Sequence, residues 1–196
     1  MPRSEQDLAK AVTSATDTFW RLGYDQTSIE EVVKSTGLNR YALYNAFGGK
    51  LDIFLAALDH YYTERRNIFL SNFNNPETAP IDAIGKVMEF AIAEMAERQS
   101  GCMMCNVASE VGRHNQQVME QVTAYLDEIK WAYGEALTSA QKNGELNSAV
   151  TPSQGAELLI TVKMGLAAQA RNGANLDDMS KVLKNALALL RRETIQ

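Results

Sequence analysis

The chain contains 196 residues, with 19 lysines and arginines against 24 aspartates and glutamates, which gives a net charge of −5. This length allows one large domain, or one small domain fused to a medium one. A composition that is 45% hydrophobic and 22% charged excludes an intrinsically disordered chain. The acidic balance also excludes the strongly basic composition that is the simplest mark of a nucleic-acid-binding protein, although a local face can differ from the average.

The N-terminal residues do not have the pattern of a secretory signal, because no apolar run follows a basic patch. No stretch approaches the roughly 20 consecutive apolar residues of a membrane-spanning helix. The two cysteines, Cys102 and Cys105, are too few for the disulfide framework of a small secreted protein. We therefore expect a soluble protein of the cytoplasm that has no membrane partner.

Apolar residues at helical spacing predict four helices in the first half of the chain. The first ends at Gly23, because a glycine is a common helix stop. Thr27 and Glu30 have the spacing of a capping box, which predicts that a short second helix begins there. Asn39 is a good N-cap for a short third helix, and a longer fourth helix begins at Leu51 after two glycines.

Five further helices are predicted in the second half of the chain, over residues 80–98, 103–111, 115–142, 152–171 and 175–190. Pro80 suits the first turn of a helix, and Thr151 and Gln154 form a capping box with Pro152 at the first helical position. Asn115 and Asn175 are the predicted caps of two others. With nine helices, no convincing strand and no repeat, the sequence predicts an all-α fold.

Residues 28–47 contain two short helices joined by Thr36-Gly37-Leu38, which is the pattern of a helix-turn-helix. In such a motif the second helix packs one face on the first helix and presents the other face to the major groove of DNA. Spacing alone leaves open an ordinary hairpin of two helices. The pattern divides the chain into a DNA-binding domain at residues 1–50 and a second domain at residues 51–196.

The residue types in this segment are more specific than the spacing of its helices. Phe19, Gly23-Tyr24, Thr27-Ser28-Ile29, Gly37, Leu43-Tyr44, Phe47 and Lys50 together resemble the DNA-binding signature of the TetR family of transcriptional regulators. The match covers about 45 N-terminal residues. Asn39 stands where serine is more usual, Gly48-Gly49 is unusually loose, and Leu51 occupies a commonly acidic position.

The resemblance implies a role for individual residues of the headpiece. Thr27 or Ser28, Tyr44 and Lys50 are similar to the residues that contact phosphates and set the register on DNA. The residues expected to face the bases, after Asn39 at the helix start, are Arg40, Tyr41, Ala42 and Asn45. In this set Arg40 could pair with guanine, Asn45 with adenine, and Ala42 could touch a thymine methyl group. Leu43 and Phe47 are expected to be core residues.

One short helix reads too few base pairs, so the resemblance implies a two-fold homodimer on near-palindromic double-stranded operator DNA. The last two helices are the expected interface, and Gly165 would allow the backbones to approach closely. The alternative is that these apolar stripes only fill the core of one chain. The expected interface residues are Leu158, Val162, Gly165, Leu166, Val182, Leu183, Ala186, Leu187 and Leu190.

The resemblance also implies a cavity between the fifth and eighth helices, where a small-molecule inducer changes the spacing of the headpieces. Methionine adapts to ligands of varied shape, so an apolar or aromatic inducer fits a methionine-rich lining. Each of these residues could instead belong to an ordinary core. The candidates are Met88, Ile92, Met95, Met103, Met104, Met119, Tyr125, Trp131 and Met164.

Cys102 and Cys105 allow three interpretations. They can be inert buried thiols, or they can sense oxidants or electrophiles, because a thiolate at a helix N-terminus has a lowered pKa and reacts more readily. A metal site would need further ligands, and His114 is the one histidine nearby. We therefore expect neither a metal nor a cofactor.

The sequence thus predicts a one-component repressor that a small molecule releases from its operator, with a redox or electrophile sensor as the alternative. A helical thiol oxidoreductase and a protein-binding adaptor are further rivals, but the expected histidine of the oxidoreductase is replaced by Ser109. Residues 1–50 carry six basic and six acidic side chains, whereas residues 51–196 carry 13 basic and 18 acidic ones. The acidity therefore lies outside the DNA-binding domain, and binding must depend on specific contacts made by a dimer.

Overall fold

The computed structural model describes residues 5–73, 78–110 and 115–192. Within these ranges the chain forms nine helices and no strand, as predicted for an all-α fold. The helices are α1 (Glu5–Leu22), α2 (Ile29–Thr36), α3 (Arg40–Phe47), α4 (Lys50–Phe73), α5 (Pro80–Arg98), α6 (Met103–Glu110), α7 (Gln116–Lys142), α8 (Pro152–Arg171) and α9 (Leu176–Leu190). Over the described ranges, none of these helices is long and apolar enough to cross a bilayer.

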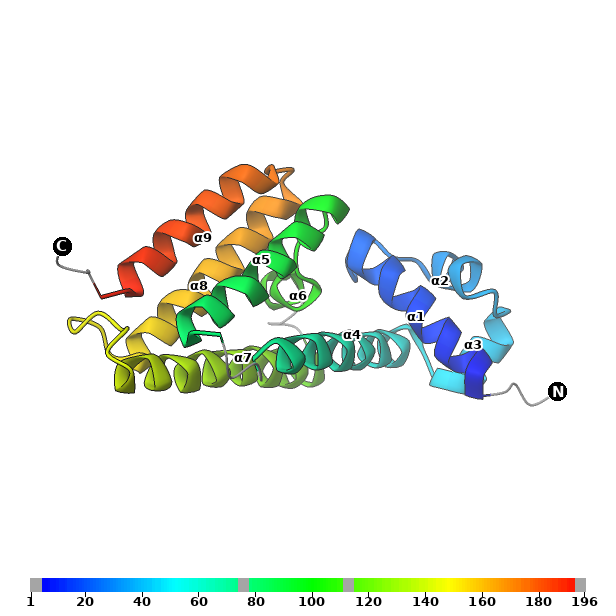
Figure 1. Ribbon diagram of the computed structural model, residues 1–196. Helices are drawn as coiled ribbons and strands as arrows, with labels where there is room; N and C mark the ends of the chain where they lie inside the picture. The colour runs from blue at the N-terminus through cyan, green and yellow to red at the C-terminus, as the bar shows by residue number, and fades with distance from the viewer. Residues whose placement is uncertain (1–4, 74–77, 111–114, 193–196) are drawn as a thin grey trace.

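The helices are arranged in an elongated molecule with α1, α2 and α3 at one end (Figure 1). Helices α4 and α7 run along one long side, and α5, α8 and α9 form the other side, with α6 between them and the headpiece. The packed pairs include α1 with α4, α5 with α9, and α7 with α8. The three helices of the headpiece are therefore joined to the rest of the molecule mainly through α4.

Aromatic side chains hold α1 against α4. The rings of Phe19 and Phe54 meet edge to face with their centroids 5.0 Å apart, and Trp20 meets Tyr61 in the same way at 5.1 Å. Pairs of this kind stabilise a core beyond the area that they bury. Because α4 starts inside the headpiece at Lys50 and continues into the second half, the division at residue 50 stays a prediction.

Most helix starts agree with the predicted caps, since the side chains of Asn39, Asn115, Thr151 and Asn175 each accept a backbone N–H of the first turn. The cap of α2 is an exception. Ser28 caps α2 and forms the capping box with Glu31, so the box predicted for Thr27 and Glu30 is wrong by one residue. Both pairs have the required spacing, and only the tertiary fold separates them.

Candidate DNA-binding surface and ligand cavity

Helix α3 carries the surface on which the sequence places the base-reading residues. Only Leu43 of this helix is buried, and it anchors α3 to the headpiece core. Tyr41 is 76% exposed, and Arg40, Tyr44 and Asn45 are also exposed. Ala42 is half-buried, and Asn39 uses its side-chain oxygen to cap the helix at Ala42 N. The fold therefore leaves one polar and aromatic face of α3 free to enter a groove.

Thr27 does not belong to this surface. It is completely buried, and its hydroxyl donates a hydrogen bond to the Gly23 carbonyl at 2.6 Å. The tight turn after α1 draws the side chain inward, so the prediction that Thr27 contacts a phosphate is wrong. The neighbouring Ser28, which was the stated alternative, is exposed at the N-terminus of α2.

Two cations flank the α3 face. The guanidinium of Arg40 forms an ion pair of 3.2 Å with Glu30 of α2, and both side chains are largely exposed. Lys50 lies half-buried with its Nζ 4.3 Å from the centre of the Tyr24 ring, which attracts the ammonium group. An exposed ion pair is worth little in water, so Arg40 can exchange Glu30 for DNA at small cost.

A cavity with a volume of about 70 Å³ lies among α1, α4, α5, α7 and α8. Its walls are mostly apolar and aromatic, and Phe90 at 54% exposure marks an edge that solvent reaches. This volume is well below the roughly 300–1,000 Å³ of typical ligand pockets, so a larger molecule would have to widen it. The lining residues include Trp20, Tyr61, Tyr62, Arg65, Val87, Met88, Ile92, Met95, Cys102, Tyr125, Ile129, Lys163 and Leu166.

The cavity lies in the region of the predicted pocket, but only some of the predicted residues line it. Met88, Ile92, Met95 and Tyr125 line the cavity. Met103 and Met104 are buried in the core and lie outside its lining. Met119, Trp131 and Met164 lie on the surface, with Trp131 64% exposed. Helical spacing identified apolar stripes on α7 and α8 but could not say which stripe faces inward.

The cavity also holds charged groups that the sequence analysis missed. Arg65 of α4 forms a two-pronged ion pair with Glu94 of α5, one contact of which is 2.7 Å long. Tyr62 donates to Glu128 of α7, and Arg66 contacts the other oxygen of that carboxylate at 2.8 Å. Burial alone would lower the pKa of Arg65, but its hydrogen bond to Glu94 makes the net direction upward. Burial alone would raise the pKa of Glu128, but the hydrogen bonds from Tyr62 and Arg66 make the net direction downward. The sequence signal that could have revealed these groups is the presence of Arg65, Arg66 and Lys163 within otherwise apolar helix stripes.

Cys102 lines the cavity and lies directly before α6, and several polar groups converge on its sulfur. The Tyr61 hydroxyl donates to it at 3.4 Å, the Lys163 ammonium lies at 3.8 Å, and the Tyr125 hydroxyl lies at 3.9 Å. All of these side chains are buried. The hydrogen bond from Cys105 is the largest influence on the Cys102 thiol, and it lowers the pKa. Burial acts in the opposite direction, but the charge of Lys163 lowers the pKa further, so the net pKa lies well below its usual range.

The partners of Cys102 shift in the complementary direction. Donation to Cys102, and then burial, raise the pKa of Cys105 well above its usual range. Burial alone would lower the pKa of Lys163, but the nearby charge of Cys102 reverses this and the net direction is upward. Burial raises the pKa of Tyr133 to about 12. These directions favour a thiolate at Cys102 beside an ammonium at Lys163, with the surrounding tyrosine hydroxyls protonated.

In the part of the chain that the structure describes, no group of three histidine, cysteine, aspartate or glutamate side chains is placed to hold a metal ion. His114, the nearby histidine considered from the sequence, lies outside the described residues.

The cavity is connected to the headpiece through Trp20. This residue of α1 lines the cavity, and its indole N–H donates to the carbonyl of Gly101 at 2.8 Å. Gly101 has φ +66°, and an added Cβ would lie 2.4 Å from the Ala167 carbonyl of α8, so only glycine fits there. Arg98 at the end of α5 contacts Asp17 of α1 at 2.8 Å. A change in the cavity wall can therefore move α1 directly.

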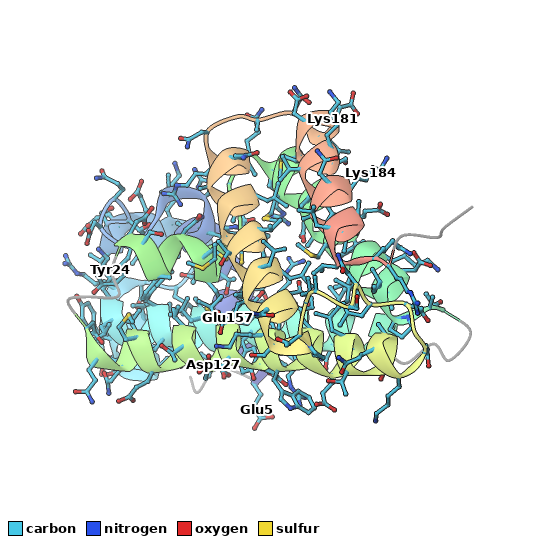
Figure 2. All side chains as sticks on the ribbon, turned by 90° about the vertical axis from the view of Figure 1, so that its left-hand side faces the viewer. Glu5, Tyr24, Asp127, Glu157, Lys181 and Lys184 are labelled. Atoms are coloured by element: carbon cyan, nitrogen blue, oxygen red, sulfur yellow. The ribbon has the colours of Figure 1, made fainter. Side chains whose placement is uncertain are left out.

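Helices α8 and α9 lie side by side and together present an open face to solvent (Figure 2). Of the predicted interface residues, Leu158, Gly165 and Val182 are exposed on this face and Val162 is half-buried. Leu166, Leu183, Ala186, Leu187 and Leu190 are buried within the chain, so assigning them to the interface is wrong. They pack inward against the other helices, as the alternative interpretation held. Leu189, which was not predicted, is 65% exposed.

An all-α chain with an exposed recognition helix at one end and a lined cavity behind it has the architecture of a ligand-responsive DNA-binding regulator. The family model described as "Tetracyclin repressor-like, C-terminal domain" matches residues 80–188, and that of "Bacterial regulatory proteins, tetR family" matches residues 11–57. The chain belongs to the TetR family of transcriptional regulators.

Individual relatives agree with this assignment. The HTH-type transcriptional regulator YezE of Bacillus subtilis (strain 168) is 25% identical over 189 residues, which cover 95% of this chain and 97% of YezE. The HTH-type transcriptional repressor ComR of Escherichia coli (strain K12) is 24% identical, over 93% of this chain and 88% of ComR. The regulator CifR, solved with a 26-bp operator DNA, has the same fold, with a TM-score of 0.81, 22% identity, and coverage of 97% of this chain and 99% of CifR.

Proposed function

We propose that this TetR-family protein is a dimeric repressor, which a small apolar or aromatic molecule releases from a near-palindromic operator by entering the cavity. The observation that carries the proposal is the position of Trp20, which is at once a cavity wall and a core residue of the headpiece helix α1. A ligand that displaces Trp20 also displaces α1, and α1 packs on the DNA-binding motif. Ligand binding and DNA binding are then coupled, and each weakens the other.

For the DNA contacts, we propose that Ser28, Tyr44 and Lys50 bind phosphates and that Arg40, Tyr41, Ala42 and Asn45 face the bases. The exposure of most of this set on one side of α2 and α3 supports the proposal. Asn39 sets the start of α3 through its cap, so its role in recognition is to fix the angle of the helix. We also propose that the protein works in the cytoplasm, because a repressor must reach its operator DNA.

We further propose that the second copy of the chain covers the α8–α9 face. Exposed apolar residues on this face support it, because a monomer rarely leaves such side chains gathered in one place. Gly165 lies among them, and a Cβ built there would meet no atom of its own chain within 4 Å. The missing side chain therefore serves no packing inside the chain and leaves room for a partner helix.

A gel-shift titration with the DNA upstream of the protein's own gene tests the repressor proposal. We expect sequence-selective binding at moderate salt, and weaker binding after a small aromatic ligand is added. An adaptor or an enzyme would not select that DNA over a shuffled sequence. The oxidoreductase rival is further weakened by Ser109, whose hydroxyl donates to the Cys105 carbonyl at 3.1 Å and so supports the helix.

Gly165→Glu tests the proposed dimer. A buried like-charge pair at the two-fold axis should convert the dimer to a monomer in sedimentation experiments, while the helical circular dichroism signal stays. Ser153→Glu, at an exposed position in the first turn of the same helix, is the matched control and should leave the dimer intact. A dimeric Gly165→Glu protein would place the interface elsewhere.

A further inference from the structure

The environment of Cys102 is unusual for a buried cysteine, because its sulfur is surrounded by donors from four helices. Tyr61 belongs to α4, Cys105 to α6, Tyr125 to α7 and Lys163 to α8. Cys102 also directly precedes α6, and the hydrogen-bonding effect of Cys105 in the first turn of that helix lowers the pKa of the Cys102 thiol. An inert buried thiol needs none of these donors, whereas a thiolate needs all of them.

Lys163 supplies the second observation. It is buried inside an otherwise apolar part of α8, and within the described residues no carboxylate forms an ion pair with it. Its ammonium faces Cys102 at 3.8 Å and the Tyr125 ring at 5.9 Å, and it lines the cavity. A buried ammonium group is stable only beside a counter-charge, and the Cys102 sulfur is the group in position to supply it.

Cys105 behaves differently although it lies three residues away. It is equally buried, but it does not line the cavity. Its thiol donates to Cys102 and so keeps its own proton. The pair is therefore asymmetric, with one reactive sulfur facing the cavity and one protonated sulfur behind it.

We propose that Cys102 and Lys163 form a covalent capture site for small, uncharged electrophiles of the α,β-unsaturated carbonyl class. The cavity volume of about 70 Å³ admits only a small molecule. Its walls are mostly apolar, and its arginines and glutamates are already paired with one another, so an uncharged molecule is favoured. The proposal deepens the proposed function, since it names a ligand class for the same cavity.

The reaction balances without an oxidant. The Cys102 thiolate attacks the β-carbon and forms a C–S bond, while the π electrons of the alkene move to the carbonyl group and give an enolate. The enolate takes a proton that Lys163 supplies, which yields a saturated ketone on Cys102 and a neutral amine on Lys163. Burial favours the neutral amine once its counter-charge is gone, so the products suit the cavity.

The adduct is well placed to act on the headpiece. Cys102 follows Gly101, whose carbonyl accepts from Trp20 of α1 and beside which the Ala167 carbonyl of α8 leaves no space for a Cβ. Because Gly101 has no room to retreat toward α8, added bulk on Cys102 pushes toward α1. We expect the adduct to lower operator affinity by roughly fivefold or more, a typical strength of coupling between two sites.

Methyl vinyl ketone is the probe, and the full-length protein is analysed by intact mass and peptide mapping. One equivalent should add at Cys102 and none at Cys105, and 2-butanone, which lacks the alkene, should neither add nor release DNA. Cys105→Ser should still form the adduct and Cys102→Ser should not. An adduct confined to other residues, or a rate at Cys102 no higher than that of free glutathione, overturns the proposal.

Lys163→Met separates a reactive pair from a merely accessible sulfur. Its addition rate at pH 7 should fall by about tenfold, because most of the thiolate is lost. The wild-type rate should change little between about pH 6 and 8, whereas the variant rate should rise with pH as an ordinary thiol ionises. Tyr61, Cys105, Tyr125 and Tyr133 also face this group but stay protonated in that range. Equal rates and pH profiles for both proteins contradict the proposal.

DNA binding is read separately from the adduct. If the unmodified protein binds no operator, the proposed repressor function fails while the capture site stands on the mass measurement. If the protein binds its operator and the Cys102 adduct leaves that affinity unchanged, the regulatory part of the capture proposal is refuted.

Discussion

Two pairs of oppositely charged groups in this molecule differ in their exposure to solvent. Arg40 and Glu30 of the headpiece meet at 3.2 Å with 62% and 69% of their side chains exposed, whereas Lys163 and Cys102 meet at 3.8 Å inside the protein. Water screens the first pair, so it is worth little and either partner can be exchanged. The second pair has lost its water, so each charge requires the other. The exposed pair suits a residue that must turn to DNA, and the buried pair suits a group that responds only when its chemistry changes.

Removing Cys102 alone should have the largest effect. Cys102→Ala leaves Lys163 buried without its counter-charge and should lower the free energy of unfolding by about 3–5 kcal/mol. Lys163→Met should cost much less, because a thiolate that loses its ammonium takes up a proton and becomes an ordinary buried thiol near neutral pH. Urea unfolding of both variants measures the contrast. Equal losses would mean that the two groups are not a charge pair.

The pH dependence of stability gives the next effect. Because the folded state lowers the pKa of Cys102, the unfolded state binds more protons below the ordinary thiol value of about 8.5. The free energy of unfolding should then decrease as pH falls from that value toward the folded pKa, by about 1.4 kcal/mol per pH unit. Urea unfolding at several pH values measures this slope, which Lys163→Met should reduce. An unchanged slope in the variant would assign it to another group.

The exposed pair is tested by operator binding. Arg40→Ala should weaken binding by roughly 1–3 kcal/mol and relax the preference at one base pair, without changing stability. A competition experiment against operators that vary one base pair at a time measures both effects. Uniform weakening at all base pairs, with a shallower dependence on salt, would instead make Arg40 a phosphate contact.

Glu30→Gln should produce the smallest change. It frees Arg40 and removes a negative charge near the phosphates, so operator affinity should rise by no more than about fivefold. Fluorescence anisotropy at two salt concentrations measures the change, which should shrink at high salt. A loss of affinity would show that Glu30 holds Arg40 in its binding position.

Much of the headpiece followed from the sequence because its signals are local. Asn39 caps α3 through a hydrogen bond that spans three residues, and Gly37 ends α2 with φ +67°, so short segments contain the whole cause. Thr27 marks the limit of such signals. Two capping boxes offset by one residue are equally good locally, and the packing of the turn after α1 buried one of them.

What the sequence by itself determined is the all-α fold, most helix boundaries and the family, since these depend on periodicity, caps and a motif within about 45 residues. The tertiary structure alone decided which stripe of a helix meets which neighbour. Helical spacing places Leu158 of α8 and Leu183 of α9 alike on apolar stripes, yet Leu158 is exposed and Leu183 is buried in the core. The cavity likewise combines Trp20, Arg65, Cys102 and Lys163 from distant parts of the chain. No local pattern relates these residues, because their proximity results from the packing of whole helices.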